Sequence, residues 1–281
     1  MSGTEFNFVP DAKWQQMELL KKINKTNSNL SRSLFTVFYR NYLVWLKYYK
    51  PGIIGDILEP LLYLAALGFG IGKFIHNING ISYIKYIVPG IIASSSMYAA
   101  AFESTFGAYT RMVTNGIYQA ILLTPIGIED IVSGEILWGT AKAFMSGTAV
   151  LIIGTVFGWI ISPAAIIIPV VIVLNGILFS SLSLLITSFS PSYDFFSYYF
   201  TIAISTMFLF SGVFYPVSSL PYAIRYFVYI MPLYYTVSIM RMLDEGKINP
   251  VLLFSYLSVI ILFALIFFYA SVYFIKKRVI K

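Results

Sequence analysis

The fold is decided by one polar stretch, Arg111–Lys142, which reads RMVTNGIYQAILLTPIGIEDIVSGEILWGTAK and interrupts an otherwise apolar chain. It predicts a short helix over Met112–Leu123, a break at Thr124-Pro125 and a new helix start at Gly127–Asp130, because acids favour a first helical turn. The short helix presents an apolar patch that nothing in its own loop covers. Such a patch indicates either a contact site for a partner protein or a helix lying on lipid. The patch consists of Ile117, Tyr118, Ile121 and Leu122.

The composition indicates a membrane protein. Of the 281 residues, 58% are hydrophobic and only 11% are charged, whereas a soluble domain carries about 25% charged residues. The chain has no cysteine and a single histidine, His76, which excludes disulfides, thiolate metal sites and a cysteine–histidine triad. The net charge of +7 comes from basic residues that cluster at both ends of the chain. This clustering indicates membrane orientation rather than nucleic-acid binding.

Six apolar runs are each long enough, at about 20 residues, to cross a bilayer as a helix. Basic clusters at both ends favour a cytoplasmic location for both termini, which requires an even number of spans. We therefore expect an all-α integral membrane protein with six transmembrane helices. The proline-containing segment 215–250 is expected to form extracellular re-entrant half-helices before the last span. The six runs cover residues 53–75, 86–109, 131–161, 165–187, 195–214 and 251–275.

The N-terminal part differs from the rest of the chain. Residues 1–33 are polar and predict a cytoplasmic tail without an apolar signal segment. Aromatic residues recur at helical spacing among basic residues in 34–50, which is typical of an amphipathic helix in the membrane interface. Pro51-Gly52 is expected to end this helix, so that residues 51–281 form the transmembrane domain. Within the first span, GFGIG at Gly68–Gly72 lacks the residues of a phosphate loop and favours close helix packing.

Two charged residues, Glu103 and Lys142, fall inside the apolar runs that flank the polar stretch. Glu103 precedes Arg111 by eight residues, which places it about 12 Å deeper at the helical rise. Lys142 follows Glu135 by seven residues and lies about 10 Å deeper on the same basis. Charges inside a membrane are costly and are usually paired or functional. We expect a structural ion pair between Glu103 and Lys142, in preference to a substrate-binding charge.

Three motifs follow one another in order along the chain. LEPLLYLAALGFGIG lies in the first span, YQAILLTPIGIEDIVSGEILW in the polar stretch, and SGVFYPVSSLP with MPLYY after the fifth span. Over about Leu34–Lys281 they resemble the permease subunit of an ABC exporter of the type-2 class. The first two motifs are most similar to its lipo-oligosaccharide nodulation exporter branch. The third resembles an extracellular signature carried here by Phe214, Pro216, Leu220, Pro221 and Pro232.

The resemblance implies an exporter that works with other chains. The sequence has no G-x-x-x-x-G-K-[ST] motif, so ATP and Mg²⁺ would bind to a separate nucleotide-binding ATPase subunit in two copies. This chain would be a transporter subunit rather than an enzyme, without a cofactor or metal of its own. It would form a homodimer with a second permease copy in the inner (cytoplasmic) membrane. Residues 112–125 would form the coupling helix, and the coupling residues would be Gly116, Tyr118, Ile121, Leu122, Thr124 and Pro125.

In such a dimer, spans two and five of each copy would form the wall of the translocation path. Aromatic and hydroxyl side chains suit an amphiphile with sugar and acyl parts, because rings stack on sugars and hydroxyls form hydrogen bonds. Ordinary helix packing by small and hydroxyl residues explains the same pattern. The residues expected on the path are Ser95, Tyr98, Phe102, Tyr199, Ser205 and Met207.

The function predicted by these features is ATP-driven export of an amphiphilic substrate, namely a lipo-oligosaccharide, polysaccharide or glycolipid. A multidrug or antibiotic efflux permease is the alternative within the same family. A secondary transporter would show an inverted repeat and spans broken at mid-bilayer. A membrane-embedded enzyme that modifies lipid or glycan would need acids, histidines or nucleophiles gathered at one depth. The sequence offers neither of these last two patterns.

Overall fold

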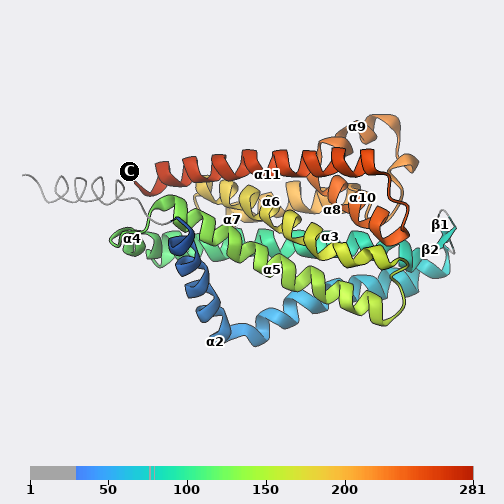
Figure 1. Cartoon of the computed structure of the whole chain (residues 1–281), viewed down its shortest axis with the longest axis horizontal. Coiled ribbons are helices and arrows are strands. Elements are labelled where there is room, and N and C mark those ends of the chain that lie inside the picture. Colours follow the sequence, from blue (N-terminus) through green and yellow to red (C-terminus); the bar gives the residue numbers. More distant parts are fainter. Residues whose placement is uncertain (1–29, 76, 79, 281) are drawn as a thin grey trace, which may run out of the picture.

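Long helices lie side by side along one axis of the molecule (Figure 1). The computed structural model describes residues 30–75, 77, 78 and 80–280, and for 30–32, 48 and 50–57 it describes the backbone alone. Most of the expected N-terminal tail, residues 1–29, lies outside the described residues. The long helices are α2 (Leu30–Ala65), α3 (Tyr83–Phe102), α5 (Ile128–Val156), α6 (Ile168–Phe189) and α11 (Pro250–Val279).

The all-α class predicted from the sequence is confirmed for the long elements. Within the described residues, three helical segments are long and apolar enough to cross a membrane, at 128–156, 163–189 and 250–279. A shorter apolar segment, Asp194–Phe210, corresponds to the fifth predicted run. It consists of α7 (Asp194–Tyr199), the π-helical turn η6 (Phe200–Ile204) and α8 (Ser205–Phe210). The third predicted run is corrected at its end, because α5 stops at Val156 and residues 157–161 are not helical.

Helix α2 contradicts the expected break at Pro51-Gly52. The interface helix predicted at 34–50 and the first span form one continuous helix, Leu30–Ala65. Figure 1 shows α2 as two straight parts that meet at a sharp bend. A proline inside a helix removes a backbone hydrogen bond and kinks the helix without necessarily ending it. Pro51 lies inside α2, so the helix continues where the sequence predicted its end.

The N-terminal part of α2 packs closely against the start of α5. A Cβ atom added to Gly134 of α5 would lie 2.6 Å from Val37 Cβ and 2.9 Å from the backbone oxygen of Leu34. Aromatic rings extend the contact, with Phe38 5.8 Å and Trp45 6.1 Å from Trp138 between ring centroids. This part of α2 is therefore attached to the helix that follows the polar stretch.

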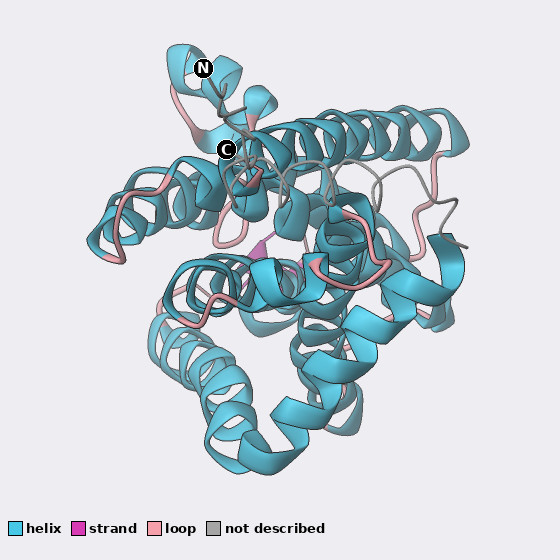
Figure 2. Cartoon of the chain, turned by 90° about the vertical axis from the view of Figure 1, so that its left-hand side faces the viewer, coloured by secondary structure: helices cyan, strands magenta, loops and turns pink. Residues whose placement is uncertain are grey.

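Short elements occupy the two ends of the bundle. Near one end lie α4 (Ile117–Leu122) and the C-terminal end of α11, while α9 (Tyr222–Ile230) and a strand pair, β1 (Asn77–Ile78) and β2 (Ile81–Ser82), lie at the other (Figure 1). The strands pair antiparallel and were not predicted. In a view from the α4 end, they lie behind the helices (Figure 2). The remaining short elements are α10 (Pro232–Glu245) and the turns η1 (Ala66–Gly70), η2 (Ile71–Lys73), η3 (Glu103–Gly107), η4 (Thr110–Thr114), η5 (Pro163–Ile167) and η7 (Val217–Ser219).

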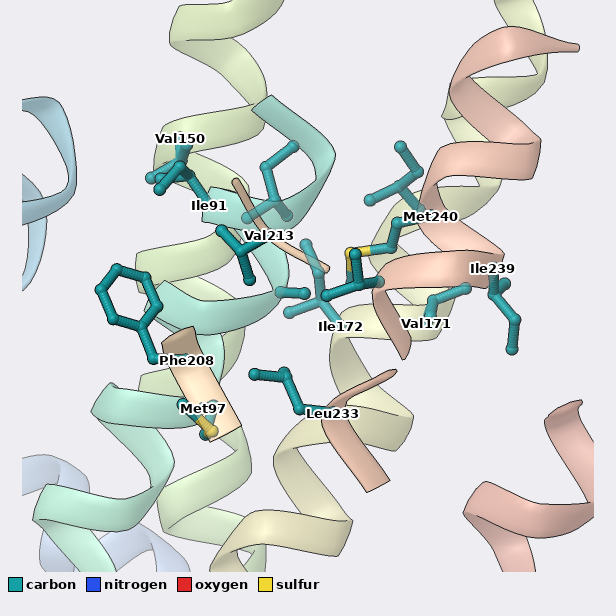
Figure 3. Close-up of a cluster of buried hydrophobic side chains, with 14 of the residues drawn as sticks. Ile91, Met97, Val150, Val171, Ile172, Phe208, Val213, Leu233, Ile239 and Met240 are labelled. Carbon is teal, nitrogen blue, oxygen red and sulfur yellow. The ribbon is translucent and has the colours of Figure 1, made fainter. Parts of the chain in front are cut away.

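The larger hydrophobic core joins α3, α5, α6, α8 and α10, as Figure 3 shows with Ile91, Val150, Ile172, Phe208 and Met240. One buried polar group ties three of these helices together. The Asn175 side-chain amide donates hydrogen bonds to Ser96 Oγ at 2.7 Å and to the backbone oxygen of Ala93 at 3.1 Å. Thr236 of α10 donates to the Asn175 side-chain oxygen at 2.9 Å. The segment predicted as extracellular half-helices therefore contains a helix, α10, that is fixed to the bundle.

Candidate functional site

The polar stretch folds into a compact connection between α3 and α5. Its backbone reverses at Gly116, which has a φ of +62°, a conformation that glycine adopts without strain. The single helix predicted at Met112–Leu123 is therefore divided into η4 and α4. Thr124 Oγ1 then donates to the backbone oxygen of Ile121 at 2.6 Å, which closes the turn before Pro125. The backbone N–H of Gly127 donates to Asp130 at 3.1 Å, so an acid holds the start of α5 as predicted.

The exposed surface of α4 differs from the surface predicted from the sequence. Tyr118 is fully buried and Leu122 is almost so, with 0% and 9% of their surfaces exposed. Both pack against the first turns of α5, in a cluster that includes Ile128 and Ile131. The expectation that Tyr118 and Leu122 contact a partner is therefore wrong, because these two side chains are covered by α5, whereas Ile117 and Ile121 of the predicted patch are only half-buried. The outward surface of the connection consists of Gln119, Ala120, Leu123, Thr124 and Pro125, with Gly116 and Ile121 half-buried.

Three charged side chains meet beside α4, and they join its two neighbouring helices. Arg111 Nη2 lies 2.5 Å from Glu135 Oε2, and Arg111 Nε donates to both oxygens of the same carboxylate. Arg111 Nη1 lies 2.8 Å from Glu103 Oε1. The Glu135 side chain is 1% exposed, and those of Arg111 and Glu103 are 15% and 16% exposed. A two-pronged contact of this kind fixes direction as well as distance.

This arrangement corrects the expected ion pair between Glu103 and Lys142. The Glu103 carboxylate pairs with Arg111, whereas Lys142 Nζ of α5 lies 5.8 Å from the ring centroid of Trp45 in α2. Glu103 and Arg111 meet over Gly107, where an added Cβ would lie 2.5 Å from Glu103 Oε1 and 3.2 Å from Arg111 Nη1. The π-helical turns η3 and η4 occupy this part of the chain. Eight residues here do not follow the straight α-helical rise that placed the two charges apart.

The electrostatics of the cluster hold Arg111 charged. Burial alone would lower the pKa of Arg111, but the carboxylates of Glu135 and Glu103 outweigh burial and raise that pKa. Burial also raises the pKa of the Tyr118 hydroxyl well above its usual range, and Glu135 raises it further. The hydroxyl therefore remains neutral beside the cluster at physiological pH. The Tyr118 oxygen has no hydrogen-bond partner among the described residues.

A second set of contacts joins the same end of the bundle to α6 and α11. Arg278 of α11 donates to the backbone oxygens of Thr187 and Ser188 at 2.7 Å and 3.1 Å, which satisfies the last carbonyls of α6. The Arg278 guanidinium also lies 5.6 Å from the ring centroid of Tyr109. Tyr109 donates to the backbone oxygen of Pro191 at 2.9 Å. The sequence predicts only that the basic residues at this end of the chain set the membrane orientation, since nothing in it marks the partners of Arg278.

The residues expected along the translocation path divide into two groups. Ser95, Tyr199 and Met207 are buried inside the chain, and Tyr199 pairs with Ser183 of α6 at 2.9 Å. These three residues pack as the helix-packing alternative predicts. The second group lies nearer the surface of α3 and the fifth span. Phe102 is 59% exposed, and the hydroxyls of Tyr98 and Ser205 lie 3.4 Å apart.

The five residues of the extracellular signature lie around α9 and α10. Phe214 packs edge-on against Phe208 with ring centroids 4.8 Å apart. The backbone oxygen of Leu220 accepts a hydrogen bond from Arg225 Nε at 2.8 Å. Pro221 immediately precedes α9, and Pro232 is the first residue of α10. Pro216 precedes η7. These residues shape turns rather than form a polar site.

Comparison with known proteins gives one consistent result. A family model described as "ABC-2 type transporter" matches residues 32–243. The chain is 35% identical over 211 residues to "Nodulation protein J" of Rhizobium meliloti (strain 1021), which covers 75% of this chain and 80% of the relative. It is 33% identical over 247 residues to "Nodulation protein J" of Rhizobium leguminosarum bv. viciae, covering 87% and 94%. "Inner membrane transport permease YadH" of Escherichia coli (strain K12) is 28% identical over 234 residues, covering 82% and 88%.

Proposed function

Because the chain belongs to the ABC-2 type transporter family, we propose that it is the transmembrane subunit of an ATP-driven exporter of amphiphilic glycans. The chain is the non-catalytic membrane component, and ATP binds to a separate subunit. The feature that carries the proposal is the connection between α3 and α5. It is short, supported from behind by buried charges, and has an exposed outer surface.

The exposed part of this connection is proposed to dock on the ATPase subunit. Leu123 is 66% exposed although it is apolar, and Gln119, Ala120, Thr124 and Pro125 surround it on the same surface. An exposed apolar side chain at the tip of a well-supported connection suits insertion into a groove of a partner. Two such ATPase chains and two permease chains would make the complete exporter.

Six spans and cytoplasmic termini are part of the same proposal. The spans are α2, α3, α5, α6, the α7–α8 segment and α11, and the outer end carries α9 and the two strands. The C-terminal end of α11 carries Lys276, Lys277 and Arg278 and lies at the same end as α4 (Figure 1). Basic residues favour the cytoplasmic side, where ATP is available. The basic end of α11 and the need of α4 to meet the ATPase therefore both favour a cytoplasmic location for this end of the bundle.

The substrate proposed is a lipo-oligosaccharide or a related glycolipid or polysaccharide. The support is similarity to several chains named "Nodulation protein J" over most of their length, together with aromatic side chains on the outer surface of the second and fifth spans. The aromatic side chains of Phe102 and Tyr198 are 59% and 66% exposed, and the aliphatic side chain of Ile202 in the fifth span is 69% exposed. We assign this surface to contact with the second permease copy and with substrate.

The docking surface is tested by co-purification of the chain with its ATPase subunit from native membranes. Leu123→Asp should abolish capture of the ATPase, because a charge cannot enter an apolar groove without a partner. Phe157→Asp is the matched control, since Phe157 is 65% exposed but follows α5 at the opposite end. Equal capture by both variants would refute docking at Leu123. A chain that arrives without any ATPase would refute the exporter assignment.

The substrate is tested in vesicles that contain the purified complex. ATP-dependent movement of a lipo-oligosaccharide, but not of a hydrophobic cationic dye, would support the proposal. Movement of the dye alone would support the efflux alternative. Transport driven by an ion gradient without ATP would overturn both assignments.

A further inference from the structure

Arg111 has a structural position that docking alone does not explain. It lies on η4, just beyond α3 and just before α4, and it reaches across to Glu135 in the second turn of α5. Glu135 is almost completely buried. The contact therefore joins the two helices on either side of α4 at a point that is largely shielded from water.

The two acids bound by Arg111 differ in what they connect. Residues 83–114 form one continuous run of helical turns, here called the first rod, and α5 is the second rod. Glu103 and Arg111 both lie on the first rod, so their contact stays within one rod. Glu135 lies on the second rod, so its contact with Arg111 joins the two rods. The same guanidinium therefore makes one contact within a rod and one contact between rods. Only the second can transmit displacement from one rod to the other.

Two further elements approach the same point. Tyr118 of α4 is fully buried beside the cluster, and the charges of Glu135 and Arg111 both act on its hydroxyl. The N-terminal part of α2 packs against α5 at Gly134, the residue before Glu135. Breaking one partner of a buried ion pair leaves a charge without compensation, which is strongly unfavourable. The four elements are therefore held in one arrangement at the base of α4.

We infer that Arg111 is a positioning residue for coupling: through Glu135 it holds the ends of α3 and α5 together, so that displacement of α4 moves both. The inference rests on the proposed function, because it needs an ATPase that displaces α4. It concerns transmission after docking and not docking itself. Loss of the contact should leave ATP hydrolysis in place and reduce the transport obtained from it.

The two carboxylates supply a matched pair of variants. Glu135→Gln and Glu103→Gln each remove one negative charge from Arg111 with almost no change in shape. In vesicles that contain the complete complex, Glu135→Gln should lower the amount transported per ATP hydrolysed about tenfold, the size of an ordinary coupling between sites. Glu103→Gln should stay within about twofold of wild type on the same scale, because it leaves the contact between rods intact.

A charge exchange separates coupling from folding. Arg111→Glu combined with Glu135→Arg re-forms the pair between rods when it is made in the Glu103→Gln background, which keeps a second carboxylate away from the new Glu at position 111. This triple variant should restore most of the transport per ATP that Glu135→Gln loses. Thermal stability of each complex is measured in parallel, since a purely structural role would alter stability and ATPase activity together. If Glu135→Gln fails to assemble, Arg111→Lys replaces it, because lysine keeps the charge but cannot make the two-pronged contact. Its transport per ATP should then fall measurably below the wild-type value.

The outcomes distinguish this inference from the function on which it rests. A wild-type ratio of transport to hydrolysis in Glu135→Gln, or in Arg111→Lys where that variant is used, would overturn the inference and leave the exporter assignment intact. An equal loss in Glu103→Gln would also overturn it, because the contact between rods would then have no special role. Absence of ATP-dependent transport in the wild-type complex would instead refute the proposed function.

Discussion

Gly134→Ala should loosen the attachment of α2 to α5. The added Cβ would lie 2.6 Å from Val37 Cβ, 2.8 Å from Val37 Cγ1 and 2.9 Å from the Leu34 backbone oxygen. Carbon atoms in contact normally lie about 3.5–4.0 Å apart, so α2 must retreat from α5. Overpacking of a tight contact costs about 1–3 kcal/mol. At about 2–4 °C per kcal/mol, the apparent melting temperature should fall by about 2–12 °C.

The assay is thermal unfolding of the detergent-purified chain, followed by loss of the monodisperse peak in size-exclusion chromatography. Gly70→Ala is the control, because a Cβ at that position would meet no atom within 4 Å. It should leave the melting temperature unchanged or raise it slightly. A Gly134→Ala chain with the same apparent melting temperature as wild type would refute the close approach of α2 and α5.

A second substitution tests whether the backbone itself causes the conflict. Val37→Ala removes the Cγ atoms but leaves Val37 Cβ and the Leu34 oxygen in place. Added to Gly134→Ala, it should therefore relieve only part of the loss, measured against Val37→Ala alone. Full relief would show that a side-chain tip, and not the helix backbone, sets the distance.

Three further predictions use the same stability assay. Tyr118→Phe removes a buried hydroxyl that has no partner among the described residues, so it should be neutral or stabilising. Tyr118→Ala also removes the ring and should cost about 3–5 kcal/mol. Equal losses of stability in the two variants would contradict the burial of the ring. Gly116→Ala should cost about 1–2 kcal/mol from its left-handed backbone alone, and Gly116→Asn should cost less; the reverse order would argue against that conformation. Burial raises the pKa of Asp244 at the end of α10 to about 6, so its ionisation opposes folding and stability should fall as pH rises from about 4 to 6. Asp244→Asn can still accept a hydrogen bond from the Ile161 N–H and should remove this fall. A variant with the same pH profile as wild type would contradict the assignment of the fall to Asp244.

The long helices and the connection between α3 and α5 were predictable because they depend on local sequence. Apolar runs of sufficient length indicate spans, and the Thr124-Pro125 break with Glu129 and Asp130 indicates where α5 begins. The structure has the later long helices near the expected places, whereas the α-helix of the first span ends ten residues early, at Ala65, and the helix expected at 112–123 is divided into η4 and α4. Pro51 misled the prediction because proline predicts a helix end and a helix bend equally well.

The details of the site were not predictable because they depend on packing between distant segments. The burial of Tyr118 requires α5 to fold back over α4, which periodicity within one loop does not report. The Glu103–Arg111 contact requires π-helical turns and the missing side chain of Gly107, whereas an ideal rise placed the two charges apart. Asn175 gave no signal in its apolar run, although it joins three helices.

The contact of Arg278 with α6 has a consequence for the order in which the protein is made. Arg278 follows Thr187 by 91 residues and Ser188 by 90 residues, so α6 is synthesised well before its partner. Until the end of α11 has been made, the carbonyls of Thr187 and Ser188 lack the donor that satisfies them in the finished structure. The end of the bundle that carries α4 is therefore completed only after α11, and a chain truncated before Arg278 leaves the end of α6 without this donor.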